Sequence, residues 1–105
     1  MKIRLYRDGV LIAESDSPEK LNFSFASNHL RLGRHSGIGR FYPCVIDEVL
    51  VINRSLSAEE IWNLYLGGYV RRAHANGLVL SLSFEEGQGN ITYDWSGNAN
   101  HGRIY

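Results

Sequence analysis

The stretch Gly77-Leu78-Val79-Leu80-Ser81-Leu82-Ser83-Phe84 decides the class of fold, because its apolar residues recur at every second position. Successive side chains of a β-strand point to opposite faces, so this period of two places Leu78, Leu80, Leu82 and Phe84 on one face. We therefore expect a protein built from β-strands.

A second strand is predicted over residues 45–52, which are apolar except for the pair Asp47 and Glu48. This composition is typical of a central strand that is buried on both faces, with the acidic pair near its start. The single cysteine, Cys44, precedes the stretch directly. Free cysteines are usually buried, so we expect a small buried side chain there and not a reactive thiol.

Further strands are predicted toward the N-terminus. Residues 2–7 alternate polar and apolar side chains, and residues 10–13 continue the pattern after Asp8-Gly9. Asp-Gly supplies the positive backbone dihedrals of a type I′ turn, so this segment predicts a β-hairpin. Residues 21–25 and 30–32 also alternate, which indicates two more short strands.

One short helix is predicted between Leu56 and Gly68. Ser57 and Glu60 have the spacing of a capping box, and the glycine pair ends the helix. The sequence as a whole therefore predicts an all-β fold with one short α-helix.

Composition limits the classes of function. The chain has 105 residues, enough for one hydrophobic core, and 11 basic residues balance 11 acidic ones. A net charge of zero does not favour nucleic acid or an anionic membrane as a partner. No apolar run reaches membrane-spanning length, and the alternating N-terminus does not read as a signal peptide. We expect neither membrane insertion nor nucleic-acid binding.

The sequence contains no arrangement of residues that is typical of catalysis. Glu85 and Glu86 are neighbours at a predicted turn, so they do not share one strand face as paired catalytic carboxylates would. The four histidines lack the spacing of metal ligands; they are His29, His35, His74 and His101. We therefore expect a protein that is not an enzyme.

Candidate ligand contacts come from aromatic residues and arginines. Sugar binding needs flat aromatic faces beside polar groups, and the best candidates are Trp95, Tyr93 and Tyr42, with Trp62 as a further possibility. Trp95 either contacts ligand from its polar loop or packs beneath that loop.

The glycine-rich residues 33–40 have no Lys-Ser/Thr ending, which argues against a phosphate-binding loop. Arg34 and Arg40 of this loop either reach an acidic sugar or protein carboxylate, or are simply solvated.

Two groups of residues together resemble a known family. Residues 46–61, from Ile46-Asp47-Glu48-Val49 to Ser57-Ala58-Glu59-Glu60-Ile61, resemble the closing segment of laminin G-like domains in the concanavalin A-like jelly-roll superfamily. Residues 77–89 and 93–102, the latter reading Tyr93-Asp94-Trp95-Ser96-Gly97-Asn98-Ala99-Asn100-His101-Gly102, resemble its opening segment.

The resemblance implies an antiparallel jelly-roll-type β-sandwich, partial or circularly permuted, because the two segments occur in reversed order. Residues 1–68 would be the closing half with its short helix, 69–76 a connector, and 77–105 the opening strands, packed as one unit with 1–68. Opening and closing strands are neighbours in the complete fold, so residues 77–84 are expected to pair with 45–52. Either a permuted domain or a chain across two tandem domains fits this order.

The resemblance also implies a structural calcium site where the opening loop meets the start of the closing strand. Asp94 and Asp47 would supply carboxylates, with Asn98, Asn100 or backbone oxygens completing the shell. The alternative is that Asp94 caps an Asx-turn and Asp47 accepts backbone hydrogen bonds.

Two functions follow from the resemblance. The first is a non-catalytic recognition module, carbohydrate-binding or adhesive, of a secreted or cell-surface protein, with a carbohydrate or protein ligand. Three glycosylation-type sequons, at Asn22, Asn53 and Asn90, fit an extracellular parent. The alternative is a structural piece that docks neighbouring domains or self-associates. The family's middle strands have no counterpart here, and proteins cover exposed sheet faces, so two copies are expected to complete one sandwich.

Overall fold

The computed structural model describes residues 2–16, 30–34, 39–67 and 77–105. These residues form six strands and one helix, in the order β1 (Lys2–Arg7), β2 (Val10–Asp16), β3 (Val49–Ile52), α1 (Ala58–Tyr65), β4 (Leu78–Leu82), β5 (Ile91–Thr92) and β6 (Gly102–Arg103). The strands pair antiparallel as β1–β2, β3–β4 and β5–β6. The predicted all-β fold with one short helix is confirmed.

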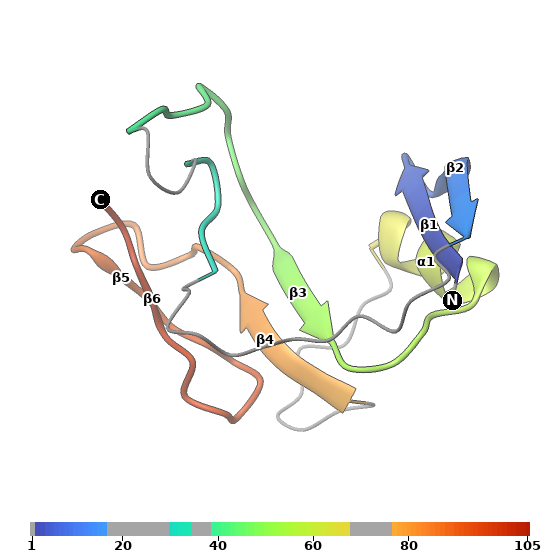
Figure 1. The fold of residues 1–105 in the computed structure, drawn as a ribbon. Coiled ribbons are helices and arrows are strands. Elements are labelled where there is room, and N and C mark those ends of the chain that lie inside the picture. Colours follow the sequence, from blue (N-terminus) through green and yellow to red (C-terminus); the bar gives the residue numbers. More distant parts are fainter. Residues whose placement is uncertain (1, 17–29, 35–38, 68–76) are drawn as a thin grey trace.

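The three strand pairs follow one another across the molecule. In Figure 1, β1–β2 lies beside α1 at one end, β3–β4 lies in the middle, and β5–β6 lies at the opposite end. No helix among the described residues has the length and apolar character that crossing a membrane requires.

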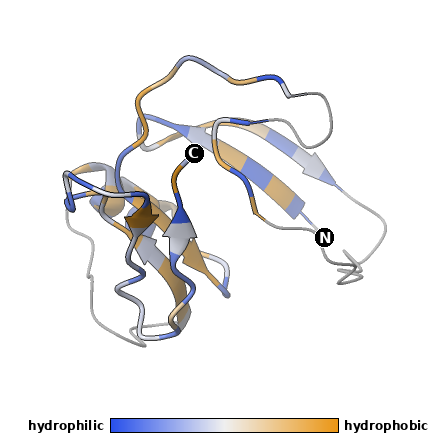
Figure 2. Ribbon diagram, turned by 90° about the vertical axis from the view of Figure 1, so that its left-hand side faces the viewer, coloured by the Kyte–Doolittle hydropathy of each residue, from blue (hydrophilic) through white to orange (hydrophobic). Residues whose placement is uncertain are grey.

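The β1–β2 hairpin has the predicted turn. Asp8 and Gly9 adopt φ angles of 53° and 76°, as a type I′ turn requires. Apolar and polar residues alternate along the strand that begins beside the N-terminal label in Figure 2. Glu14 forms ion pairs with Lys2 and Arg4, at 2.8 and 3.0 Å, on the charged face of the hairpin.

Helix α1 is capped as predicted and packs against the hairpin turn. The Glu60 N–H donates to Ser57 Oγ at 3.1 Å. Gly67 follows the C-cap with φ of 88°, and its N–H donates to the Leu64 carbonyl. A Cβ atom at Gly9 would lie only 2.7 Å from the Trp62 ring, so the turn needs glycine for space as well as for its dihedral angles.

The core of the described residues lies on β4. Leu78, Leu80 and Leu82 are buried, and β4 pairs with β3 so that Val49 lies opposite Leu82. The expected pairing of the two stretches is therefore confirmed. Phe84, placed with the leucines by the alternation, lies beyond the end of the strand.

The strand predicted over residues 45–52 is shorter in the structure. The strand begins only at Val49, and Val45 is 97% exposed. The Asp47 carboxylate accepts a hydrogen bond from the Glu48 N–H at 3.0 Å, and Glu48 has a φ of 52°, which turns the chain before the strand. The prediction that Cys44 is buried at a strand start was wrong, because this cysteine is exposed.

Other predictions concern residues outside the described part of the chain. They are the strand over 21–25, the centre of the glycine-rich loop at 35–38, and the connector at 69–76.

Candidate functional site

The segment from Ile91 to Ser96 alternates strictly between exposed and buried side chains. Its outward residues are Ile91, Tyr93 and Trp95, which are 46%, 50% and 55% exposed. Its inward residues are small or polar and almost fully buried; they are Thr92, Asp94 and Ser96. The segment therefore displays one aliphatic and two aromatic side chains on a polar, buried support.

Asp94 is the centre of this support. Its Oδ1 accepts from the N–H groups of Ser81 and Ser96, both at 2.9 Å. Its Oδ2 accepts from the Ser96 hydroxyl at 2.8 Å and from the Asn100 N–H at 3.0 Å. Burial by itself would raise the pKa of Asp94, but hydrogen bonds from Ser96, Ser81 and Asn100 outweigh it and hold the pKa below its ordinary value. Asp94 is therefore an anion at neutral pH.

Every backbone N–H from Tyr93 to Ser96 has an acceptor. The Tyr93 N–H donates to Glu86 Oε1 at 2.7 Å, which is the largest influence lowering the pKa of Glu86. The Asp94 N–H donates to His101 Nδ1 at 3.0 Å. The Trp95 N–H donates to the Ser81 carbonyl at 2.9 Å, which ties the loop to β4. The backbone beneath the two aromatic rings is therefore fixed in place.

Asn98 and Asn100 tie the far end of the loop to the same strand. Asn98 Nδ2 donates to the carbonyls of Leu78 and Val79, and Asn100 Nδ2 donates to that of Val79. The Ser96 N–H bond to Asp94 is that of an Asx-turn, the alternative that the sequence left open. In the structure the Asp94 carboxylate accepts four hydrogen bonds from protein donors. Calcium binding by Asp94, Asn98 and Asn100 stays a prediction.

Arg34, Arg40 and Tyr42 lie in a second exposed loop. The Arg34 guanidinium carbon lies 5.2 Å from the centroid of the Phe41 ring, and these two residues form an isolated β-bridge. The Tyr42 N–H donates to the Gly33 carbonyl at 2.9 Å, and the Tyr42 side chain is 69% exposed. Their role in ligand binding stays a prediction.

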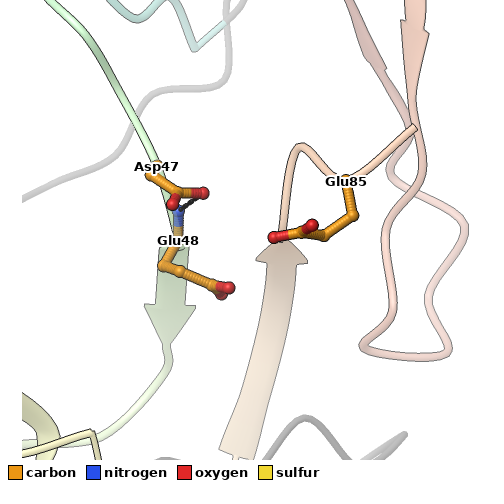
Figure 3. A group of neighbouring side chains, drawn as sticks. All are labelled: Asp47, Glu48 and Glu85. Carbon is orange, nitrogen blue, oxygen red and sulfur yellow. Dashed lines mark hydrogen bonds between the residues drawn. The ribbon is translucent and has the colours of Figure 1, made fainter. Parts of the chain in front are cut away.

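Asp47 lies in a cluster of three carboxylates at the end of the β3–β4 pair. It joins Glu48 and Glu85, and one carboxylate oxygen from each residue lies within 4.8 Å of the others. Figure 3 shows Asp47 and Glu48 at the start of β3 and Glu85 beyond the end of β4. Sequence reasoning missed Glu48 and Glu85 as partners of Asp47. Antiparallel pairing places the start of one strand beside the end of the next, and this was the usable signal.

Backbone conformation contributes to the cluster. Glu48 and Phe84, the residue before Glu85, have φ angles of 52° and 56°. This left-handed region is uncommon for residues other than glycine, and each instance costs about 1 kcal/mol or more. The turns at Glu48 and Phe84 place the carboxylates of Glu48 and Glu85 close to each other.

The carboxylate cluster suits a calcium ion by donor type and spacing. Calcium takes six to eight oxygen ligands at about 2.3–2.6 Å, so two oxygens across one ion are separated by at most about 5 Å. The candidate ligand oxygens of Asp47, Glu48 and Glu85 lie within 4.8 Å of one another, so they are close enough to contact one ion. The three carboxylates would supply some of the ligands, and backbone oxygens and water would supply the others.

Comparison with known proteins identifies a family for part of the chain. A laminin G family model, described as Concanavalin A-like lectin/glucanases superfamily, matches residues 1–62, which is more than half of the chain. The match includes β1, β2, β3 and the first part of α1. No curated protein and no solved structure matches the chain. The assignment of residues 77–105 to the opening segment stays a prediction.

Proposed function

Because the chain belongs to the Concanavalin A-like lectin/glucanases superfamily, we propose that it is a non-catalytic recognition module, carbohydrate-binding or adhesive, of a secreted or cell-surface protein. The observation that carries the proposal is the outward display of Ile91, Tyr93 and Trp95 on a backbone held by Asp94. Exposed aromatic rings on a rigid support are what sugar stacking requires.

The physical advantage of this support is preorganisation. Binding normally costs free energy for ordering loops and side chains, about 0.5–1.5 kcal/mol for each immobilised side chain. Here the backbone bonds of Tyr93 and Trp95 are already made, so a sugar orders only the two rings. The fixed spacing of the rings then selects ligands by shape.

Replacing Trp95 tests the proposal. We expect Trp95→Ala to weaken glycan binding about fivefold or more in titration calorimetry, because stacking on one exposed aromatic ring contributes on the order of 1 kcal/mol or more. Tyr65→Ala is the matched control, since Tyr65 is an aromatic residue of similar exposure that lies on α1. Melting curves of both variants verify folding. A glycan screen that stays blank with and without calcium contradicts carbohydrate binding.

A calcium ion is proposed at the carboxylate cluster. Asp47, Glu48 and Glu85 would hold it, and its charge would offset the repulsion among three neighbouring carboxylates. Such an ion would join the start of β3 to the chain beyond β4, and its role would be structural.

Self-association is a second candidate function, favoured by the exposed apolar side chains of the hairpin. Ile3 and Leu5 of β1 are 48% and 58% exposed, while the buried apolar residues among those described are the three leucines of β4. Covering the hairpin face with a second copy would complete more of a sandwich. The ligand in this case is the chain itself.

A further inference from the structure

The sequon Asn90-Ile91-Thr92 lies at the start of the short β5–β6 ladder, directly after an open turn. Asn90 is exposed, and no hydrogen bond within the described residues engages its side-chain amide. Gly87 and Gly89 precede it with φ angles of 66° and 78°, and a Cβ atom at either glycine would meet no atom within 4 Å. Asn90 is therefore an exposed acceptor beside a turn that leaves room for a bulky group.

The backbone at Asn90 is fixed, although its side-chain amide makes no such bond. The Ile104 N–H donates to the Asn90 carbonyl at 2.8 Å and extends the pairing beyond β6. A Cβ atom at Gly102 would lie 2.7 Å from the Thr92 methyl carbon, so the two strands approach this closely only because residue 102 is glycine. A group attached to Asn90 therefore starts from a defined position.

Asn90 also lines a shallow hollow of about 320 Å³ on the β5–β6 pair. The other lining residues supply an aliphatic side chain, an imidazole, a glycine and a guanidinium; they are Ile91, His101, Gly102 and Arg103. The volume is at the lower end of the range for small-molecule sites, which suits a ligand of one or two sugar rings. The first ring of a glycan joined to Asn90 would lie at this hollow.

The hollow offers both apolar surface and hydrogen-bond donors to such a ring. The Ile91 side chain is 46% exposed, so the C–H face of a sugar would remove apolar surface from water. His101 Nδ1 accepts the Asp94 N–H, which places the hydrogen of the neutral imidazole on Nε2. This Nε2 and the Arg103 guanidinium are donors for hydroxyl and acetyl oxygens. Covalent attachment raises the effective concentration of the sugar to about the millimolar range, so weak contacts suffice to hold it.

We propose that Asn90 is an N-glycosylation site and that the first sugar of its glycan occupies this hollow. The proposal rests on the secreted or cell-surface location in the proposed function, because a chain in the secretory pathway meets the lipid-linked oligosaccharide that donates the glycan. In the transfer, the Asn90 amide nitrogen forms a bond to C1 of the first sugar and loses one proton. The bond from C1 to the lipid diphosphate breaks, and the diphosphate leaves with the electron pair.

Thr92 determines when the sugar is attached. An Asn-X-Ser/Thr acceptor requires the hydroxyl two residues after the asparagine. In the folded chain Thr92 is 2% exposed, and its hydroxyl donates to Glu86 Oε1 at 3.3 Å. Transfer therefore precedes closure of the β5–β6 ladder, and the sugar meets the hollow as the ladder forms. The pair lies at the end of the molecule opposite the β1–β2 hairpin (Figure 1), so the glycan leaves the hairpin face open.

The first test is site-resolved mass spectrometry on the chain secreted from mammalian cells behind a signal peptide, with a reporter sequon on a flexible C-terminal tail. We expect a glycan at position 90 in most molecules of the wild-type chain and in none of Asn90→Gln. An unmodified Asn90 on chains whose reporter is glycosylated would overturn the site. The chain made in bacteria carries no glycan and serves for the ligand titrations, so failure of the recognition function is measured separately from failure of glycosylation.

The second test asks whether the first sugar occupies the hollow, in a chain whose other sequons are removed by Asn22→Gln and Asn53→Gln. We expect the glycosylated form to melt about 4 °C above the form without glycan, and to keep this increase when an endoglycosidase trims the glycan to one sugar. The amidase that removes the whole glycan converts the asparagine to an aspartate, so Asn90→Asp is the matched control for the form without glycan.

Substitution of a lining residue tests the same contact independently. Arg103→Gln should remove at least half of the increase in Tm that the glycan gives, while Arg7→Gln on β1 should keep it. Equal Tm for the trimmed form and Asn90→Asp, or an increase in Arg103→Gln as large as in the wild type, would overturn the placement of the sugar in the hollow.

Discussion

At the scale of single residues, Asp94 has the strongest structural role among the predicted site residues. It is 7% exposed, and its two oxygens accept four hydrogen bonds that reach β4 and both ends of its own loop. Its position between Tyr93 and Trp95 means that one buried carboxylate orients two exposed aromatic rings. The same residue therefore contributes to folding stability and fixes the positions of the two exposed aromatic residues.

We expect Asp94→Asn to destabilise the chain by about 1–3 kcal/mol, because an amide nitrogen cannot accept and leaves buried donors unpaired. The lowered pKa of Asp94 gives this loss a pH dependence with a definite sign. A depressed pKa stabilises the fold above the ordinary value of 3.8, and the contribution is lost as pH falls through the lower, folded value.

Urea unfolding at pH 7 and at pH 3 or below measures this effect. The stability difference between wild type and Asp94→Asn should shrink at the lower pH, while the exposed control Asp16→Asn should show a small difference throughout. A gap between wild type and variant that is constant with pH contradicts the role given to the Asp94 charge.

At the scale of elements, the pairing of β3 with β4 brings together the residues of the proposed cation site. Val49 lies opposite Leu82, so the residues just before β3 and just after β4 meet at one end of the pair. Glu48 and Glu85 reach this position from the two strands, and the three leucines of β4 form the adjacent core. An ion held there would stabilise the pairing that unites the two halves of the chain.

We expect calcium to raise the Tm of the wild-type chain, because an ion that binds only the folded state stabilises by about 2.7 kcal/mol at one hundred times its Kd. Glu85→Gln should remove most of this increase, since it deletes one of three charged ligands. Glu59→Gln, on the exposed first turn of α1, is the control. An unchanged Tm in calcium and in chelator, measured by calorimetry on wild type, argues against the site.

At the scale of the whole molecule, the described residues form an open arrangement of three strand pairs (Figure 1). Their buried apolar residues are Leu78, Leu80 and Leu82, whereas the β1–β2 hairpin exposes Ile3, Leu5 and Ile12. Exposed sheet faces and edges are normally covered or paired in stable proteins. We propose that association of copies covers the exposed apolar side chains of the described residues.

We expect light scattering on the purified chain to give a molar mass of at least twice the 11.9 kDa of one copy. Leu5→Glu should shift the distribution toward the monomer, because a buried charge on the apolar hairpin face opposes association. Arg7→Gln on the same strand changes the net charge by the same amount and controls for that change. A monodisperse monomer at high micromolar concentration contradicts self-association.

The sequence by itself determined the local features of this protein. The Asp8-Gly9 turn, the Ser57 cap of α1 and the alternation of Leu78, Leu80 and Leu82 all appear in the structure as predicted. Each depends on interactions among residues only a few positions apart, such as a dihedral preference or a strand period. The family was also recognisable, because its motifs are local strings of residues.

The resemblance predicted that residues 77–84 pair with residues 45–52, but only the tertiary structure decided which of the distant side chains meet. Strand pairing brought Glu48 beside Glu85. Contact of the loop with β4 placed the Asp94 carboxylate where it accepts the Ser81 N–H, whereas from the sequence calcium binding and an Asx-turn were equally good alternatives for Asp94. The exposure of Cys44 likewise follows from the chain turning before β3. The physical reason is that the burial of a side chain and the groups that contact a carboxylate depend on contacts between segments far apart in the chain. Local conformational preferences do not determine those contacts.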